Sequence, residues 1–346
     1  MKEKNFEFLR GISCICIIVL HVSGWCYGEY GYGSEIDQYF CGATFFNVIT
    51  RYAVPSFIML TGAFTLNNPK NCHFLSYYKK VFWSTVLPTL SASVVYVLYT
   101  MLMKVVFGGQ AAMDAALGSI KLWIIYGDPY GHMWYMYMLM GFLIWAPFLC
   151  RFYQTLTLPL KWIIGLVGVT IGCVWYGTGE VIWPLKFLQH IGFFFLGAVI
   201  REQAKTHKVL KVAKISGVVS VLILVLTYLL VYGQTVSLIP LRIDFQQRLS
   251  PTIIIGSVAT FIWISNLKMN HNPVSKIAEH SFFVYLIHGG VISVIDNIWN
   301  DILHLQTITP WIYVPVVSLL TLVISYGVSI VLEKGYDRMF LEKRRR

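Results

Sequence analysis

The chain has 346 residues, of which 57% are hydrophobic and 12% are charged. A soluble domain carries about 25% charged residues, so this composition excludes an ordinary soluble protein and indicates an integral membrane protein. The net charge of +11 does not indicate a nucleic-acid partner, because the basic residues fall in short clusters between hydrophobic runs, as membrane topology requires.

Hydrophobic runs along the chain predict an all-α integral membrane protein with about ten transmembrane helices. We expect one multi-pass domain over residues 1–346, surrounded by the lipid bilayer and without a soluble domain. The predicted helices cover residues 9–28, 44–66, 82–106, 133–150, 161–177, 187–201, 215–233, 250–267, 278–295 and 311–332.

The positions of the basic residues predict the orientation of these helices. With the N-terminus inside, most of the 27 Lys and Arg residues fall in segments on the cytoplasmic side. This asymmetry predicts that both termini are cytoplasmic and that the protein lies in the inner (cytoplasmic) membrane of a cell. The basic residues on the other side or within helices are Arg51, Lys104, Lys121, Lys186, Arg242 and Arg248.

The segments between the helices carry few further signals. The longest outer segment, residues 107–132, is predicted to form a short amphipathic helix on the outer surface. Cys26 and Cys41 flank the first outer loop and would form a disulfide if that compartment is oxidising. The seven cysteines contain no CxxC pair and no ligand-like spacing, so we expect no metal site.

Arg10 and His21, in the first predicted helix, are the most informative pair of polar residues. Eleven residues are close to three helical turns, so both side chains lie on one face, roughly 16 Å apart along the axis. If Arg10 marks the cytoplasmic surface, His21 lies near the middle of the bilayer. An imidazole can exchange a proton near neutral pH, and polar groups at this depth are costly, which favours a functional role. The alternative is a histidine that only hydrogen-bonds another helix.

Three further ionisable residues lie within predicted helices. Arg51 is about seven residues inside the second helix, where it either extends to the membrane surface or offers a planar cation to a ligand. His288, in the ninth helix, is either functional or a structural hydrogen-bonding residue, and His190 is expected at the interface. No acidic residue is expected deep in a helix, which argues against an ion-coupled pump. The sequence also lacks phosphate-binding, dinucleotide-binding, zinc-protease and serine-hydrolase motifs.

Four segments, in order along nearly the whole chain, resemble one family. They are NFEFLRGISCICIIVLHVSG with its Arg-(x)₁₀-His spacing, RYAVPSFIMLTGAF, GHMWYMYMLMGFLIWAPFL and IAEHSFFVYLIHGGVIS. Together they resemble the membrane-bound acyltransferase-3 family, and most closely its members that O-acetylate bacterial surface polysaccharides.

The resemblance implies an acetyl-CoA-dependent O-acyltransferase. An acyl group, usually acetyl from cytoplasmic acetyl-CoA, would pass to a hydroxyl of a cell-envelope glycan or lipid-linked saccharide. Acetyl-CoA would be a co-substrate, and no permanently bound cofactor is expected. Arg10 would hold a CoA phosphate or the pantetheine arm, and His21 would act as general base or, in a less favoured version, as nucleophile.

The same resemblance suggests roles for the other polar residues. Arg51 or His288 would stabilise the oxyanion or orient the sugar, with Tyr285 as a further donor. His132, Trp134 and Tyr135 would line the acceptor side.

Other readings of the sequence stay open at this point. The main alternative is a transporter of a small solute, such as the amino acid serine, with the same fold and no acyl transfer. A catalytically silent membrane scaffold is a second alternative. The sequence also allows a homodimer.

Overall fold

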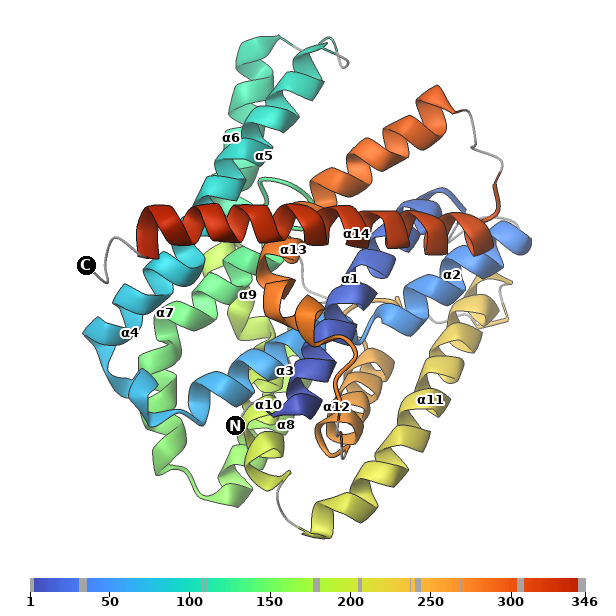
Figure 1. The fold of residues 1–346 in the computed structure, drawn as a ribbon. Coiled ribbons are helices and arrows are strands. Elements are labelled where there is room, and N and C mark those ends of the chain that lie inside the picture. The colour runs from blue at the N-terminus through green and yellow to red at the C-terminus, as the bar shows by residue number, and fades with distance from the viewer. Residues whose placement is uncertain are drawn as a thin grey trace.

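The computed structural model describes residues 3–30, 36–106, 109, 111–176, 181–204, 207–236, 238–239, 244–267, 269, 271–303 and 308–341. Within these residues every regular element is a helix, and the α-helices pack into one bundle (Figure 1). The α-helices are α1 (Lys4–Tyr30), α2 (Gln38–Thr50), α3 (Ala53–Leu66), α4 (Phe74–Val81), α5 (Leu87–Val106), α6 (Ala112–Tyr126), α7 (Trp134–Thr155), α8 (Leu158–Tyr176), α9 (Trp183–Gln189), α10 (Ile191–Gln203), α11 (His207–Thr235), α12 (Pro251–Ser265), α13 (Ser275–Asn297) and α14 (Pro310–Tyr336). The short elements are the 3₁₀ helix η1 (Pro69–Cys72) and the π-helical turns η2 (Phe82–Val86), η3 (Ile298–Ile302) and η4 (Asp337–Leu341).

The prediction of an all-α, multi-pass membrane protein is confirmed. By length and composition, the described residues contain 8 helices able to cross a membrane, or 9 if the bent pair α9 and α10 forms one span. The sequence predicted about ten such helices, close to this number. Every predicted run does contain a helix, but α12 has only 15 residues and falls short of spanning length.

The sequence predicted that Arg51 lies within one continuous helix, but the structure shows a turn at this residue. α2 ends at Thr50, Arg51 and Tyr52 form a turn, and α3 begins at Ala53. Pro55 explains the break, because a proline lacks the N–H that would bond the carbonyl four residues earlier, and its ring clashes with that carbonyl. Since that residue is Arg51, the guanidinium sits at a turn inside the span.

Contacts between helix ends agree with the prediction that successive helices cross the membrane in opposite directions. At one end of the bundle Arg201 pairs with Glu3 at 3.0 Å, and Asn67 donates to the carbonyl of Ala198 at 2.8 Å. At the other end the Tyr99 and Ser293 hydroxyls lie 3.1 Å apart. These groupings match the two predicted sides, while the assignment of one side to the cytoplasm stays a prediction. The basic residues Lys2, Lys205, Arg242, Lys268, Lys343, Arg344, Arg345 and Arg346 lie outside the described residues.

Three further predictions can be compared with the structure. Within the predicted surface segment 107–132, α6 pairs with α5, and the two extend together beyond the rest of the bundle (Figure 1); residues 107, 108 and 110 lie outside the described part. Cys26 and Cys41 do not form the predicted disulfide. The absence of acidic residues deep within a helix stays a prediction. Asp296, one residue beyond the predicted ninth helix and near the end of α13, is buried within the protein and accepts a hydrogen bond from the Tyr313 hydroxyl at 2.5 Å.

The backbones of α3 and α10 lie in close contact. A Cβ at Gly62 would overlap the carbonyl of Phe194, and a Cβ at Gly197 would overlap the carbonyl of Met59. Small residues allow two helix backbones to approach closely, which is a common device in membrane proteins. This contact fixes α3 beside the helix that bears Arg201.

We expect Gly62→Ala to lower the unfolding temperature of the purified protein. The added methyl would force the two backbones apart, and overpacking of this kind costs about 1–3 kcal/mol. Gly327→Ala is the matched control, because no atom lies within 4 Å of the Cβ position of that helical glycine. Thermal unfolding in detergent would compare the two variants, and equal unfolding temperatures would contradict the packing argument.

α1 positions the candidate site because it lies in the interior of the bundle, in contact with α2, α3, α12, α13 and α14 (Figure 1). Its buried residues include Leu9, Ile17 and Val22, at or below 2% exposure. Apolar side chains hold the helix among its neighbours, and polar side chains in its middle, such as those of Ser13 and Ser23, are therefore buried against other protein groups.

Candidate active site

Three elements that are distant in sequence bring three imidazoles together. His21 comes from α1, His132 from the turn before α7, and His288 from α13. The ring centroids are 5.2 Å apart for His21 and His288, 6.2 Å for His21 and His132, and 4.6 Å for His132 and His288. We call these three residues the histidine cluster.

A backbone hydrogen bond sets the tautomer of His288. Its Nδ1 lies 2.7 Å from the carbonyl oxygen of Tyr285, one turn earlier on α13. A carbonyl can only accept, so Nδ1 carries the proton and Nε2 of the neutral ring is an acceptor. That Nε2 is buried and has no hydrogen-bond partner among the described residues. It is therefore available to orient a neighbouring N–H group.

His132 is held tightly at the edge of the cluster. The Tyr285 hydroxyl donates to its backbone carbonyl at 2.5 Å, and its ring stands edge-on to Tyr96 with centroids 5.2 Å apart. Gly289 lies against the ring so closely that a Cβ there would overlap it. The position of His132 thus depends on the absence of a side chain at residue 289.

The three histidines differ in their accessibility. His132 is 3% exposed and His288 is fully buried, whereas His21 is only half-buried. His21 is therefore the member of the cluster with surface left to contact a substrate. The other two imidazoles are placed to support it.

Two guanidinium groups act electrostatically on His21. They belong to Arg51, in the turn between α2 and α3, and Arg248, just before α12. Arg51 donates through Nε to Asn47 Oδ1 at 2.8 Å and lies 3.4 Å from Gln246 Oε1. Both guanidinium groups therefore lie within electrostatic range of His21.

Arg248 is stacked on an aromatic surface. Its guanidinium carbon lies 3.7 Å from the ring centroid of Trp134 and 6.0 Å from that of Tyr176. Trp134 in turn lies 6.3 Å from the ring of His190, which is buried within the protein. Trp134 thus belongs to this second group, next to the histidine cluster.

Arg10 lies away from the histidine cluster, toward the start of α1. Its guanidinium carbon is 5.6 Å from the Phe64 ring, and that of Arg201 is 4.2 Å from the same ring. Both arginines stand at the end of the bundle where Arg201 pairs with Glu3. The spacing predicted from the sequence, roughly three turns between Arg10 and His21, is preserved because α1 is one unbroken helix.

The structure therefore brings together most of the residues selected from the sequence. His21, His132, His288, Tyr285 and Tyr135 form one contiguous group, in which the rings of Tyr135 and Tyr285 are 5.3 Å apart. Arg51 and Trp134 adjoin this group, and Arg10 approaches it from the other end of α1, through an electrostatic interaction with Tyr135.

Sequence reasoning missed Arg248, Gln246 and the inward position of His190. A weak signal was present, since Arg248 directly precedes a predicted helix on the side opposite most basic residues.

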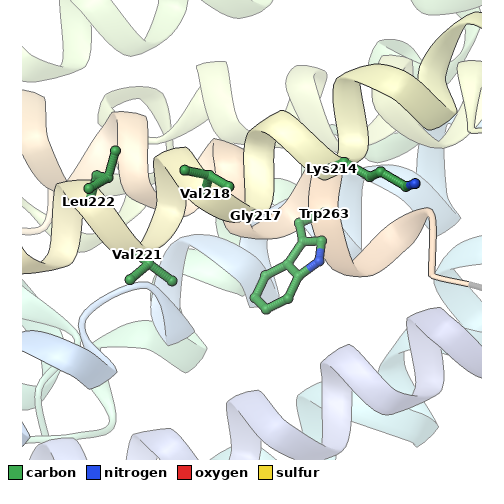
Figure 2. Close-up of a pocket in the computed structure, with 6 residues that line it drawn as sticks. All are labelled: Lys214, Gly217, Val218, Val221, Leu222 and Trp263. Carbon is green, nitrogen blue, oxygen red and sulfur yellow. The ribbon is translucent and has the colours of Figure 1, made fainter.

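The described residues contain no group of three His, Cys, Asp or Glu side chains arranged to hold a metal ion. They do form a surface groove of about 480 Å³ between α11 and α12 (Figure 2). Val218, Val221 and Leu222 line it, Lys214 stands at one end, and Trp263 packs against Gly217. No residue of the histidine cluster lines this groove, and its apolar walls match the rest of the lipid-facing surface.

Fold and site together define a multi-pass helical membrane protein with an interior cluster of three histidines. A family model described as an acyltransferase domain (acyltransferase-3) matches residues 3–330, so the chain belongs to this family of membrane acyltransferases. No curated protein and no solved structure matches the chain.

Proposed function

We propose that the protein transfers an acetyl group from cytoplasmic acetyl-CoA to a hydroxyl of a cell-envelope glycan or lipid-linked saccharide, in the cytoplasmic membrane. The observation that carries the proposal is the placement of Arg10 and His21 on one unbroken helix, with His21 inside the histidine cluster. Membership of the acyltransferase family supplies the reaction class.

Arg10 is the proposed contact for the donor. A guanidinium matches phosphate geometry, so Arg10 would hold a phosphate of CoA at the cytoplasmic end of the bundle. The stacked Phe64 limits the freedom of the guanidinium. The extended pantetheine arm would then reach along α1 toward His21, roughly 16 Å away.

His21 is the proposed general base for the acceptor hydroxyl. As His21 removes the proton, the hydroxyl oxygen attacks the thioester carbonyl carbon and forms a tetrahedral oxyanion. The C–S bond then breaks, the acetyl ester remains on the acceptor, and the proton on His21 passes to the departing CoA thiolate. A single imidazole thus serves first as base and then as acid.

His288 is proposed to orient His21 during this sequence. Its Nε2 is an acceptor, so it is suited to receive the N–H of His21 and leave the other His21 nitrogen free for the substrate proton. Because this Nε2 carries no proton, His288 is a poor oxyanion donor. That role falls better to Arg51 or Arg248, which are both electrostatically coupled to His21.

A two-step route, in which His21 carries the acetyl group as an acetyl-imidazole, uses the same residues. Rapid acid quenching followed by mass spectrometry would detect acetyl on His21 in that case, and none if His21 acts only as a base.

Release of free CoA by the purified protein in nanodiscs tests the proposed function. The assay would contain acetyl-CoA and a crude envelope-glycan fraction, and transferred acetyl would be measured as ester on the glycan. We expect CoA release that depends on both the protein and the glycan. Absence of release, together with uptake of a small solute such as serine by proteoliposomes, would favour a transporter instead.

A further inference from the structure

We infer that the acceptor is an acidic saccharide, whose carboxylate or phosphate is bound by Arg248 stacked on Trp134. This inference rests on the proposed function insofar as the saccharide is the acyl acceptor. It adds the chemical class of that saccharide and the residue that recognises it.

The geometry of Arg248 favours an acidic ligand. Stacking on Trp134, at 3.7 Å from guanidinium carbon to ring centroid, fixes the plane of the guanidinium and leaves its N–H edge for a ligand. That edge matches the two oxygens of a carboxylate or phosphate. Among the described residues no carboxylate lies within ion-pair distance of Arg248, so no described side chain takes this place.

The charge beside His21 also favours an acidic ligand. Arg248 acts on this imidazole, and a guanidinium within a membrane protein is costly unless a partner compensates it. A neutral sugar would not compensate this cation. An acidic sugar would, and it would also place its hydroxyls beside the half-buried His21.

Two buried polar side chains in the same region, those of Gln246 and His190, each have a nitrogen without a partner among the described residues. Gln246, which lies 3.4 Å from Arg51, is 3% exposed, and its Nε2 has no hydrogen-bond partner among the described residues. The same holds for Nε2 of His190, whose Nδ1 faces the Lys186 carbonyl at 3.2 Å and is therefore the protonated nitrogen. Buried polar groups normally have partners. A donor amide and an acceptor imidazole beside two cations suit a ligand that carries hydroxyls and an acid.

Binding can be tested without turnover by thermal unfolding of the purified protein at constant ionic strength. The probes are glucose 1-phosphate, glucuronic acid, inorganic phosphate and glucose. We expect at least one of the two acidic sugars, at about 100-fold excess over its Kd, to raise the unfolding temperature by roughly 4 °C. The acidic sugar that gives the larger shift shows whether phosphate or carboxylate is the preferred acid. Glucose and inorganic phosphate should give smaller shifts.

Variants then assign the shift to Arg248. Arg248→Gln should weaken binding of the acidic sugar by about 10-fold or more, whereas Arg248→Lys, which keeps the charge, should lose less. Arg151→Gln is the matched control, because Arg151 is also stacked on an aromatic ring, Phe74 at 4.5 Å, but lies roughly 25 Å farther along α7 than Trp134. This control should bind like the wild type.

Parallel CoA-release assays separate the two proposals. CoA release without any shift from either acidic sugar, or with an equal shift from glucose or from inorganic phosphate, would overturn the inference and leave the proposed function intact. An Arg248-dependent shift without CoA release would support the binding site and count against acyl transfer. Full binding by Arg248→Gln would overturn the assignment to this residue.

Discussion

His21→Ala is expected to lower acetyl-CoA-dependent CoA release by about 10²–10⁴-fold, the range that a positioned general base contributes. No other imidazole in the cluster can replace it, since His132 and His288 are buried and His288 already donates through Nδ1 to a backbone carbonyl. The rate under saturating acetyl-CoA and glycan is the measurement. Affinity for acetyl-CoA, measured separately, should change little.

His271→Ala is the control for this variant, because His271 is exposed and lies outside the cluster. Both variants should purify as monodisperse proteins with similar unfolding temperatures. A His21→Ala protein that is folded and releases CoA at the wild-type rate would remove His21 from the mechanism. Loss of activity in His271→Ala as well would show that the assay reports on damage to the protein and not on the site.

Arg10→Ala is expected to raise the KM for acetyl-CoA by about 10- to 100-fold with a much smaller change in kcat. A hydrogen bond to a charged group is worth about 1.5–3 kcal/mol, which corresponds to this range. Arg10 stands about three turns from His21, so its removal takes away binding and leaves the acid–base groups in place. Steady-state kinetics with varied acetyl-CoA is the measurement.

Two further variants test the specificity of that effect. Arg10→Lys should recover part of the affinity, since it keeps the charge but not the planar fork. Lys4→Ala removes an exposed positive charge from the same end of α1 and should leave KM nearly unchanged. A lower kcat with unchanged KM in Arg10→Ala would contradict the assignment of Arg10 to the donor.

Several features of the protein follow from the sequence because they depend on local order along one helix. Hydrophobic runs of spanning length identify the membrane helices, since backbone groups within lipid must be satisfied inside each segment. The spacing of Arg10 and His21 places both on one face of α1, because helical periodicity is set by the backbone and not by neighbours. Membership of the acyltransferase family was also visible in four short segments of the sequence.

Other local features were overlooked although the sequence contains their cause. Pro55 breaks the second run at Arg51, and His190 lies at the 50° bend between α9 and α10. A hydropathy average over many residues does not reveal such local breaks within a span. The same averaging made Pro251–Ser265 look long enough to cross the membrane.

Only the tertiary structure decided how the polar residues combine. His132 and His288 are 156 positions apart, yet their rings are 4.6 Å apart because α13 packs next to the turn before α7 and Gly289 leaves room for the imidazole. Arg248 reaches Trp134 through a similar long-range approach. The sequence determined which groups lie along each helix, because periodicity is local. The partners of those groups depend on close packing between helices, and that packing is fixed by shape complementarity over the whole bundle.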